Sequence, residues 1–515
     1  MMKRVEINGL GQLGVNRDMS ASELPPNAWS DCNNVRCREG RIETINGYSE
    51  LVSVSGEALH LASLKTETAP YWIFPVDIAD DGYAKAIYET SDGTSSTAIT
   101  RSGGAYSDSE QWNHCHVSGA VILNNGVDPP QYWTGTGLCV DMPYSGGNTW
   151  SDVSYSAKVV RSFKSYLIAL YIKDGANIYP HMVHWSHPVA PNGIASIDWD
   201  YTNDTLDANR RDLPDTPGPI VDGLALRDAF LVYKEDSIWS LTYAGDEFVF
   251  QSRLVTKSRG LINQNCVVSV GAFHVAMDRR DIYKTDGNTY QSIVDDIVQK
   301  AIFSSIDAES YDKIYLCHNR SSYEVWVCFQ EAGADKVNRR WIYNYQTGQW
   351  TKADLDGMNY IVPGYVLSTA GLGVPTDWDS ETSLDWDSET EWSWLQQSFD
   401  PTSATLGGAK GNIVIFGDTR TEEGSAIESF VERVDLSISD TDRHDEVQTV
   451  VPRMPGSGPV TIYVGTQEVA GGPVTYDDGT AFDPASDVRI DVLANGRRHA
   501  IKYTGTDIRL EAHAF

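Results

Sequence analysis

Three histidines in one short stretch are the first residues whose types and spacing could bind a metal ion. His181, His184 and His187 lie in the sequence YPHMVHWSHP. On a β-strand the first two would point to opposite faces, because side chains alternate with a period of two residues. A shared metal would therefore need a bend beside Pro180 or Pro188. We favour the simpler interpretation, polar residues at the end of a strand.

Other groups of potential ligands are weaker candidates. His114 and His116 flank Cys115 and would share one face of a strand, but the neighbouring sequence supplies no further ligands. Two acidic stretches, 77–84 and 475–487, could bind Ca²⁺ through closely spaced oxygens. Neither has the spacing of an EF-hand or of a Ca²⁺-binding nonapeptide repeat. We interpret them as solvated turns, with a Ca²⁺ site as the open alternative.

The sequence contains none of the catalytic motifs that we searched for. It lacks a Gly-x-Ser-x-Gly elbow, a phosphate-binding glycine loop before a helix, a zincin motif and the Asp boxes of sialidase propellers. A glycosidase needs two neighbouring carboxylates, but with 71 acidic residues any pair could be chosen. We therefore predict a protein that is not an enzyme and that needs no metal or cofactor.

The charge of the chain restricts its partners. The 515 residues carry 71 acidic against 40 basic side chains, a formal net charge of −31. Surfaces that bind nucleic acid are normally basic, so this balance argues against such a surface. The negative charge either keeps the protein soluble or forms a surface past which nucleic acid moves without being bound.

Cysteine usage and hydropathy indicate where the chain folds. The seven cysteines are single and no Cys-x-x-Cys occurs, which is typical of a protein that folds in a reducing cytosol. No apolar run approaches the roughly 20 residues of a membrane helix, and the N-terminus has no apolar secretion signal. We expect no membrane insertion.

The elements that must position all these residues are repeated β-hairpins. Between Ala58 and Trp350 an alternating apolar strand, a tight polar turn and a second strand ending on Trp or Tyr recur, for example in 228–243 and 323–350. One hairpin buries too little apolar surface to be stable alone, whereas stacked copies share a core. The spacing predicts six clusters of blade length: 58–101, 112–150, 157–200, 219–256, 266–295 and 312–353. Apolar residues at i, i+3 and i+4 also predict a helix over 293–307.

We predict an all-β fold, a β-propeller-like repeat array with an additional small C-terminal β-sandwich or barrel domain. An irregular N-terminal segment with a hairpin covers 1–55, and the propeller covers 56–370. An acidic, Trp-rich insertion with a return strand follows at 371–427. The C-terminal β domain covers 428–515, where Asn495-Gly496 marks a hairpin.

The insertion combines acidic residues with tryptophans. The hexamer Asp-Trp-Asp-Ser-Glu-Thr starts at Asp377 and recurs at Asp385. Because disordered segments rarely keep so many aromatic residues, we expect the indoles to dock on a neighbouring subunit or on the repeat array. The candidate channel or interface residues are Asp377, Trp378, Asp379, Glu381, Asp385, Trp386, Asp387 and Glu389.

Four stretches of the chain resemble one protein family. They are the pattern GVNRDMSASELPPNAWSDCNNVRCREGRIETINGY (14–48), the Val-x-Trp-Ser step within 162–199, the stretch 222–250 followed by the strands of 271–287, and SSYEVWVCF with IYNYQTGQW within 321–350. The C-terminal 496–515 is a weaker match. In these stretches the chain resembles the tail nozzle proteins, also called tail tubular or head-to-tail stabilisation proteins, of short-tailed bacteriophages.

The resemblance implies a structural virion protein of the tail that is made in the host cytoplasm. Such proteins form homo-oligomeric rings, usually hexamers, beneath the portal and adaptor, and present surfaces for fibres or spikes. The ring continues the channel for the outgoing genomic DNA, which passes without specific binding. No catalytic residues carry over. An acidic channel wall would suit this role, because each Lys or Arg contact with a phosphate holds the duplex.

Two other classes of function stay open at this stage. A propeller-type glycan-binding or glycan-degrading tail component would use Trp378, Trp386, Trp392 and Trp394 to stack on sugar rings. A protein-binding propeller scaffold from a cell would have asymmetric partners instead of rings.

Overall fold

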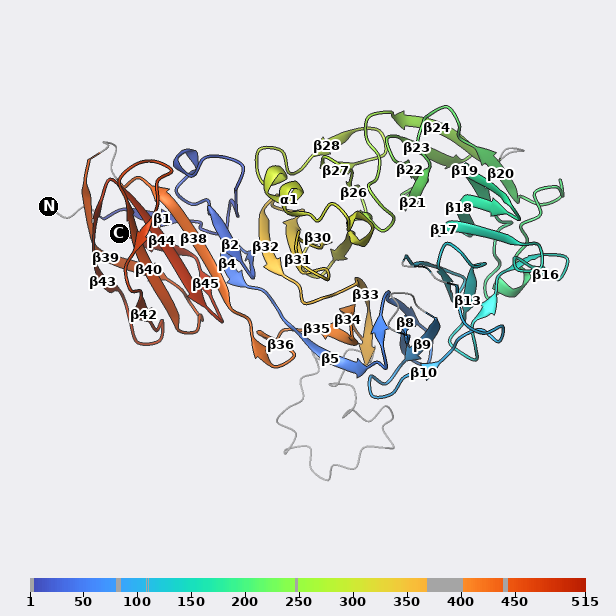
Figure 1. The fold of residues 1–515 in the computed structure, drawn as a ribbon, viewed down its shortest axis with the longest axis horizontal. Coiled ribbons are helices and arrows are strands. Elements are labelled where there is room, and N and C mark those ends of the chain that lie inside the picture. Colours follow the sequence, from blue (N-terminus) through green and yellow to red (C-terminus); the bar gives the residue numbers. More distant parts are fainter. Residues whose placement is uncertain are drawn as a thin grey trace, which may run out of the picture.

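The computed structural model describes residues 4–79, 85–107, 109, 111–245, 249–367, 402–438 and 443–515. These residues form antiparallel strands almost throughout, with one short α-helix, α1 (Gln299–Ser305). The strands form a ring of radially arranged sheets and, beside it, a smaller body of packed sheets (Figure 1). The predicted all-β class, a propeller with a small C-terminal sandwich, is confirmed. No helix in these ranges is long and apolar enough to cross a membrane.

The ring is a seven-bladed β-propeller, and six of its blades are continuous in sequence. Blade 1 contains β6 (Glu57–Ala58), β7 (Ala62–Lys65), β8 (Pro70–Asp77), β9 (Ala86–Thr90) and β10 (Thr97–Ala98). Blade 2 contains β11 (Asn113–Val117), β12 (Ala120–Asn124), β13 (Gln131–Trp133) and β14 (Val140–Asp141). The small hairpin β15 (Pro143–Ser145) and β16 (Asn148–Thr149) follows it. Blade 3 contains β17 (Tyr155–Phe163), β18 (Tyr166–Asp174), β19 (Asn177–Trp185) and β20 (Asn209–Asp212).

The remaining continuous blades have the same antiparallel order. Blade 4 contains β21 (Ile220–Leu226), β22 (Ala229–Lys234), β23 (Ile238–Tyr243) and β24 (Phe250–Thr256). Blade 5 contains β25 (Val267–Ser269), β26 (His274–Met277), β27 (Ile282–Thr285) and β28 (Tyr290–Ser292). Blade 6 contains β29 (Tyr315–Asn319), β30 (Glu324–Phe329), β31 (Arg339–Asn344) and β32 (Trp350–Asp354).

Blade 7 closes the ring with a strand from the N-terminal part of the chain. It contains β33 (Tyr360–Leu367), β34 (Thr402–Ala409), β35 (Asn412–Phe416) and β5 (Tyr48–Ser53), extended by the hairpin β36 (Thr421–Glu422) and β37 (Ser425–Ala426). β5 pairs with β35 from Tyr48 opposite Phe416 to Ser53 opposite Asn412. On its other side β33 packs beside β7 of blade 1. The structure therefore has one blade more than the six predicted clusters, and the predicted boundaries at 55 and 370 both divide blade 7.

Apolar faces between neighbouring blades hold the ring together. β18 reads YLIALYIKD, and its first five side chains are buried. Between blades 3 and 4 the rings of Phe163 and Phe230 lie 5.9 Å apart, in a core that also contains Trp239. Burying one such side chain contributes about 1.5–3 kcal/mol. A blade is stable because both of its faces are covered by its neighbours, as the repeat pattern predicts.

The second body is a sandwich built from both ends of the chain. One sheet has the order β2-β38-β44-β40-β41, with β42 also on β40, and the other has the order β1-β46-β39-β43. Their bounds are β1 (Glu6–Asn8), β2 (Asp31–Asn33), β38 (Ser429–Leu436), β39 (Asp445–Arg453), β40 (Val460–Gln467), β41 (Thr475–Tyr476), β42 (Thr480–Phe482), β43 (Ile490–Gly496), β44 (Arg498–Gly505) and β46 (Ala512–Ala514). A small sheet of β3 (Val35–Arg38), β4 (Arg41–Thr44) and β45 (Arg509–Leu510) joins them. The domain expected at 428–515 is thus completed by strands from the first 44 residues of the chain.

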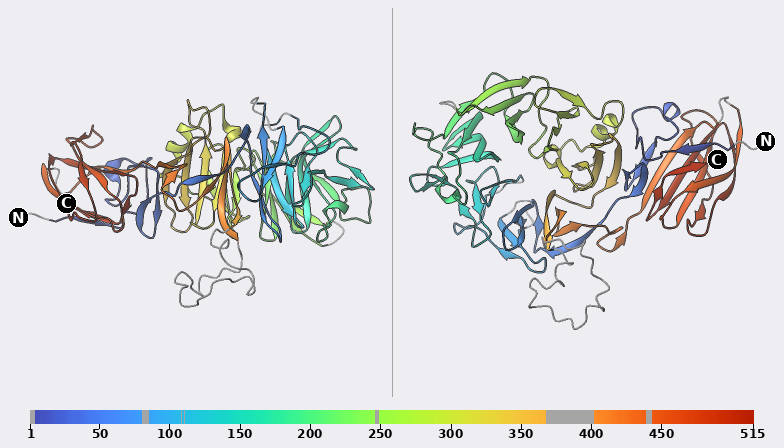
Figure 2. Two further views of the ribbon diagram at one scale, coloured as in Figure 1. Left: turned by 90° about the horizontal axis from the view of Figure 1, so that it is seen from below. Right: turned by 180° about the vertical axis from the view of Figure 1, so that it is seen from behind.

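The sandwich and the propeller share one continuous core. Trp29 is buried against Tyr503 and His513 of the sandwich, with ring centroids 6.4 Å apart in both contacts. The same core runs on to Trp350 and Trp341 of blade 6. Figure 2 shows the two bodies side by side from two further directions, with the N-terminal strands between them.

The predicted helix over 293–307 is shorter than expected. Val294, Val298 and Ile302 are buried, as the apolar spacing predicts. However, Asp296 has a φ of +57°, a left-handed conformation that cannot continue a right-handed helix. The residues before Gln299 form turns, and only α1 is helical.

Candidate functional site

The candidate channel or interface residues lie outside the described residues. β33 ends at Leu367 and β34 begins at Thr402, so the acidic, Trp-rich insertion is placed within the β33–β34 hairpin of blade 7. The candidates in question are Asp377, Trp378, Asp379, Glu381, Asp385, Trp386, Asp387 and Glu389. Among the described residues, the candidates for a functional site are the polar side chains near the propeller axis and at the junctions of blade 7 and of the sandwich.

One residue from each of the seven blades lies in a series of contacts around the propeller axis, in which blades 5 and 6 are linked by the Leu316 N–H, next to Tyr315, donating to the Asn265 carbonyl at 2.9 Å. We call this set the axial ring: His60, His114, Arg161, Asp222, Asn265, Tyr315 and Tyr360. Each lies in, or within two residues of, the first strand of its blade. The sequence pattern of any single blade does not reveal the set, because its members share neither residue type nor motif.

The charged half of the axial ring is an ion pair between blades 3 and 4. Arg161 donates to both carboxylate oxygens of Asp222, from Nε at 2.9 Å and from Nη2 at 2.7 Å. Nη1 also donates to the carbonyl of His114 at 2.9 Å, and the backbone N–H of Asn265 donates to Asp222 at 2.9 Å. Asp222 is fully buried and Arg161 is 9% exposed. The pair therefore joins four consecutive blades through hydrogen bonds.

The other half of the axial ring is aromatic. The Nε2 atom of His60 and the Nδ1 atom of His114 are 2.9 Å apart, so one imidazole donates to the other. His60 also stacks on Tyr360, with ring centroids 4.1 Å apart, and Tyr360 lies 5.2 Å from Tyr315. Burial, with the nearby charge of Arg161, lowers the pKa of His60 to about 3. Burial and the neighbouring His60 also hold the pKa of His114 well below its usual value.

Side chains also connect blades on opposite sides of the axis. Arg161 of blade 3 donates to the Oδ1 atom of Asn265 in blade 5 at 2.9 Å, and Asn265 donates to the carbonyl of Trp112 beside blade 2 at 3.0 Å. Gln111 donates to Asn263 at 3.0 Å across the same space. These bonds cross the space around the propeller axis. They pair the buried charged and polar groups with one another.

Of the three histidines that suggested a metal site, His184 and His187 have protein partners, whereas the buried Nδ1 of His181 has no hydrogen-bond partner among the described residues. His184 is buried, its Nδ1 lies 3.1 Å from the Tyr155 hydroxyl and its Nε2 lies 3.0 Å from the Trp199 carbonyl. His187 accepts the Asp207 N–H at 3.1 Å. Both ring nitrogens of His184 are therefore occupied. The described residues contain no group of three or more His, Cys, Asp or Glu that could hold a metal ion.

The acidic stretches have turn-forming contacts where the structure describes them. Asp77 accepts the Ala79 N–H at 3.1 Å. Asp477 accepts the N–H groups of Val464 and Gly479, both at 3.1 Å. These contacts fit the interpretation as turns.

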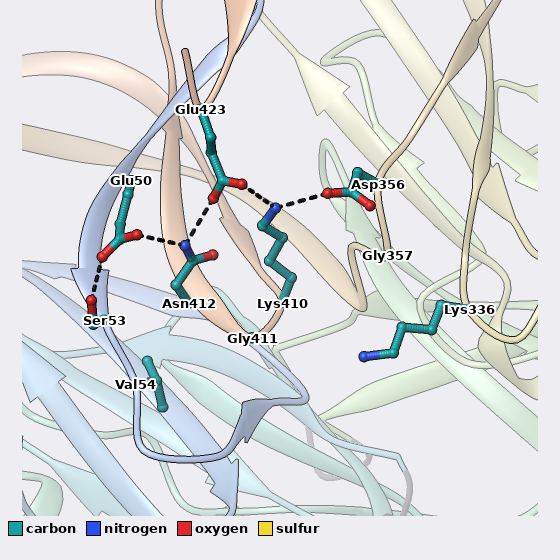
Figure 3. Close-up of a pocket in the computed structure, with 10 residues that line it drawn as sticks. All are labelled: Glu50, Ser53, Val54, Lys336, Asp356, Gly357, Lys410, Gly411, Asn412 and Glu423. Carbon is teal, nitrogen blue, oxygen red and sulfur yellow. Dashed lines mark hydrogen bonds and ion pairs between the residues drawn. The ribbon is translucent and has the colours of Figure 1, made fainter. Parts of the chain in front are cut away.

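A pocket of about 480 Å³ lies where β5 joins blade 7 (Figure 3). Its central ammonium, Lys410, lies 2.8 Å from Glu423 and 3.0 Å from Asp356. Asn412 donates to Glu423 at 2.8 Å and to Glu50 of β5 at 2.9 Å. Burial opposes the charge of Lys410, but the hydrogen bonds that its ammonium donates to Glu423 and Asp356 outweigh this effect and raise the pKa of Lys410. The polar groups here pair with one another and fasten β5 to its blade.

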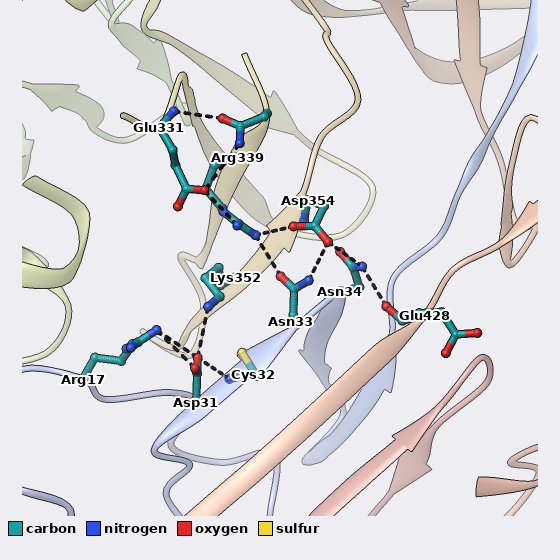
Figure 4. Close-up of polar contacts among 11 residues, drawn as sticks. Arg17, Asp31, Cys32, Asn33, Asn34, Glu331, Arg339, Lys352, Asp354 and Glu428 are labelled. Atoms are coloured by element: carbon teal, nitrogen blue, oxygen red, sulfur yellow. Dashed lines mark hydrogen bonds and ion pairs between the residues drawn. The ribbon is translucent and has the colours of Figure 1, made fainter. Parts of the chain in front are cut away.

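A second polar cluster joins the propeller to the N-terminal strand of the sandwich (Figure 4). Asn34, directly after β2, donates to Asp354 of blade 6 at 3.0 Å and to the carbonyl of Glu428 at 2.8 Å. Its own Oδ1 accepts the Asp354 N–H at 2.8 Å. Arg339 pairs with the same Asp354 and donates to Asn33 at 3.0 Å. The cluster fixes the angle between the two bodies.

Comparison with known protein families and with curated proteins finds no match to this chain. Among solved structures it is similar to the WD40 domain of Pan2 from Neurospora crassa, at 8% identity and a TM-score of 0.38 over 74% of this chain and 98% of that one. It is also similar to the computationally designed Ika8 protein, at 10% identity and a TM-score of 0.36 over 72% and 99% of the two chains. PorZ, a surface component of the type-IX secretion system of Porphyromonas gingivalis, has 9% identity and a TM-score of 0.36, over 85% of this chain and 46% of PorZ. These distant likenesses carry no argument about function.

Proposed function

We propose that the chain is a structural, non-enzymatic subunit of the tail nozzle of a short-tailed bacteriophage. Copies of it would form a ring, a hexamer by the family resemblance, beneath the head-to-tail adaptor and would anchor fibres or spikes. The role is suggested by the resemblance to such proteins of 14–48, 162–199, 222–250 with 271–287, and 321–350. The contacts described above add physical support to it.

The observation that carries the proposal is an open sheet edge on the sandwich. β43 is the last strand of its sheet and pairs only with β39 among the described residues. Leu493 on this strand is 80% exposed, and Val488 just before it is 77% exposed. An exposed edge with apolar side chains is a template for pairing with another chain, and native proteins cover such edges. A second copy in a ring would cover this one.

The axial ring supports the same arrangement. Because hydrogen bonds span the axis of each propeller, a path for duplex DNA would have to lie between copies of the chain. The net charge of −31 suits the wall of such a path, because a wall with few cations would not hold the phosphates. Closed ring symmetry also removes free edges.

Sedimentation equilibrium of the purified protein tests the proposal. We expect a discrete homo-oligomer for the native chain, and we expect Leu493→Glu to shift the mass toward the monomer, because a buried unpaired carboxylate opposes association. Leu138→Glu is the matched control, since Leu138 is an exposed apolar residue (48%) of the propeller, far from β43 in sequence. A native chain that is monomeric at micromolar concentration would contradict the proposal.

A further inference from the structure

A second pocket lies between blades 2 and 3, away from the sandwich. It measures about 470 Å³, within the ~300–1,000 Å³ of small-molecule sites. Its wall on the blade 3 side comes from three adjacent strands, β17, β18 and β19. Gln264 and Asp312 reach it from blades 5 and 6, so the pocket lies near the propeller axis.

Tyr171 gives this pocket an aromatic wall at a strained position. The pairing of β18 with β19 shifts between Leu170 and Ile172, which marks a β-bulge at Tyr171. Its φ is +55°, a left-handed conformation that is strained for a bulky residue. Bulges of this kind re-aim side chains beside functional sites. Ile178, 56% exposed, adds an apolar surface on the neighbouring strand.

Two cations line the same wall. Lys173 lies opposite Ser156 of β17 in the strand register, and Lys158 is two residues further along β17. The ammonium of Lys158 is 5.7 Å from the centroid of the Tyr171 ring. Neither lysine has a carboxylate partner within ion-pair distance among the described residues. In a chain with a charge of −31, two such cations in one pocket favour an anionic ligand.

Gln264 supplies a buried acceptor without a donor. Gln264 is one of the residues that line the pocket, it is 2% exposed, and its Oε1 atom has no hydrogen-bond partner in the described part of the chain. Leaving a buried acceptor unpaired is unfavourable, so we expect a donor on the ligand to pair with it. The carboxylate-bearing Asp312 also lines the pocket. These acceptors call for hydroxyl groups on the ligand.

We propose that this pocket binds a carboxylated sugar, with a hexuronic acid as the simplest form. The pyranose ring packs on Tyr171 and Ile178, and the carboxylate lies near Lys158 and Lys173. Ring hydroxyls donate to Gln264 and Asp312. A nucleotide phosphate is disfavoured, because it brings a second negative charge toward Asp312. The proposal stands independently of the nozzle role, since it uses no residue of the sandwich edge.

Isothermal titration of the full-length protein with glucuronate, galacturonate, glucose and adenosine monophosphate tests the proposal. We expect at least one uronate to bind about tenfold more tightly than glucose and than the nucleotide. Lys158→Gln and Lys173→Gln should each weaken that binding about tenfold. Tyr171→Asn should also weaken it, and Asn tolerates the left-handed backbone. Lys164→Gln is the matched control, an exposed lysine of blade 3 that does not line the pocket.

The native protein alone can overturn the inference, whatever the variants do. Three results would each contradict it: no uronate binding at millimolar uronate in tenfold excess over the protein, glucose binding as tight as that of the uronate, or tighter binding of the nucleotide. Equal loss of binding in Lys164→Gln would do the same. Sedimentation of each variant separates this result from the nozzle proposal, because pocket variants should keep the native oligomer mass.

Discussion

Arg161 and Asp222 form a bidentate ion pair across the boundary between blades 3 and 4, with nitrogen–oxygen distances of 2.9 and 2.7 Å. Buried pairs of this kind add little net stability compared with an apolar pair, but removing one partner leaves an uncompensated buried charge. The pair therefore fixes the relative position of two blades near the axis. Its contribution to the free energy of unfolding can be measured by substituting one of the two residues.

Arg161→Met should strongly destabilise the propeller. The variant leaves the carboxylate of Asp222 buried without its cation, and we expect the free energy of unfolding to fall by about 3–5 kcal/mol. Urea denaturation followed by tryptophan fluorescence measures the change. The double variant Arg161→Met, Asp222→Leu should recover most of the loss. A single variant within about 1 kcal/mol of the native protein would show that the pair does not hold the axis.

Arg340 is the matched control for this experiment. Its guanidinium is also buried, between blades 6 and 7, but none of its three nitrogens has a hydrogen-bond partner among the described residues. It lies over the ring of Trp326, 4.4 Å from the centroid. Arg340→Met should therefore be neutral or stabilising, because it removes a poorly paired buried charge. Equal destabilisation by the two substitutions would mean that loss of packing, and not loss of the pair, decides the result.

Stability should fall as the pH is lowered below about 6.5, the ordinary pKa of histidine. Burial, with the charge of Arg161, lowers the pKa of His60 to about 3 in the folded chain. Between these two values the unfolded chain binds more protons, so stability falls with decreasing pH, by up to about 1.4 kcal/mol per pH unit for such a group. Protonation also places a donor on both sides of the His60–His114 contact.

Thermal unfolding between pH 7 and pH 4 checks this dependence. His60→Phe keeps an aromatic ring against Tyr360 but cannot titrate, so its melting temperature should change less with pH than that of the native protein. His444→Gln serves as the control, because the side chain of His444 is 51% exposed. If His60→Phe retained the full native slope, the paired imidazoles would not be the source of the effect.

Asn34→Ala should loosen the junction between propeller and sandwich. Asn34 has a φ of +55° and bonds to Asp354 and Glu428, so alanine removes the side-chain bonds and adds backbone strain. We expect a loss of about 1–3 kcal/mol in local stability. Hydrogen exchange should show faster exchange in β2 and β32. Asn34→Gly relieves the backbone strain, so its smaller effect would isolate the side-chain contribution, and unchanged exchange in both variants would contradict the assigned role.

The repeat pattern was sufficient to predict the propeller but not its closure. Each continuous blade carries its strands and turns within one stretch, so local alternation reveals it. Blade 7 depends on the pairing of Tyr48 with Phe416, and the sandwich depends on the pairing of Glu6 with Ala514. No local signal in either partner reports such distant pairings, so the predicted boundaries divided both bodies.

The candidate sites could be predicted less well than the fold. The acidic, Trp-rich segment was singled out by composition, whereas the axial ring consists of single polar residues in otherwise apolar strands. His114 and Arg161 could have been noticed as polar side chains near the starts of inner strands. Their contacts could not be predicted, because they depend on the geometry of ring closure.

Electron cryomicroscopy of the purified, assembled protein tests the central claim most directly. The account predicts a closed ring of identical subunits with a channel of duplex width between the copies. Each propeller axis should be filled by side chains, among them those of Arg161 and Asn265. Particles that contain only single subunits, or an open channel of duplex width along a propeller axis, would contradict it.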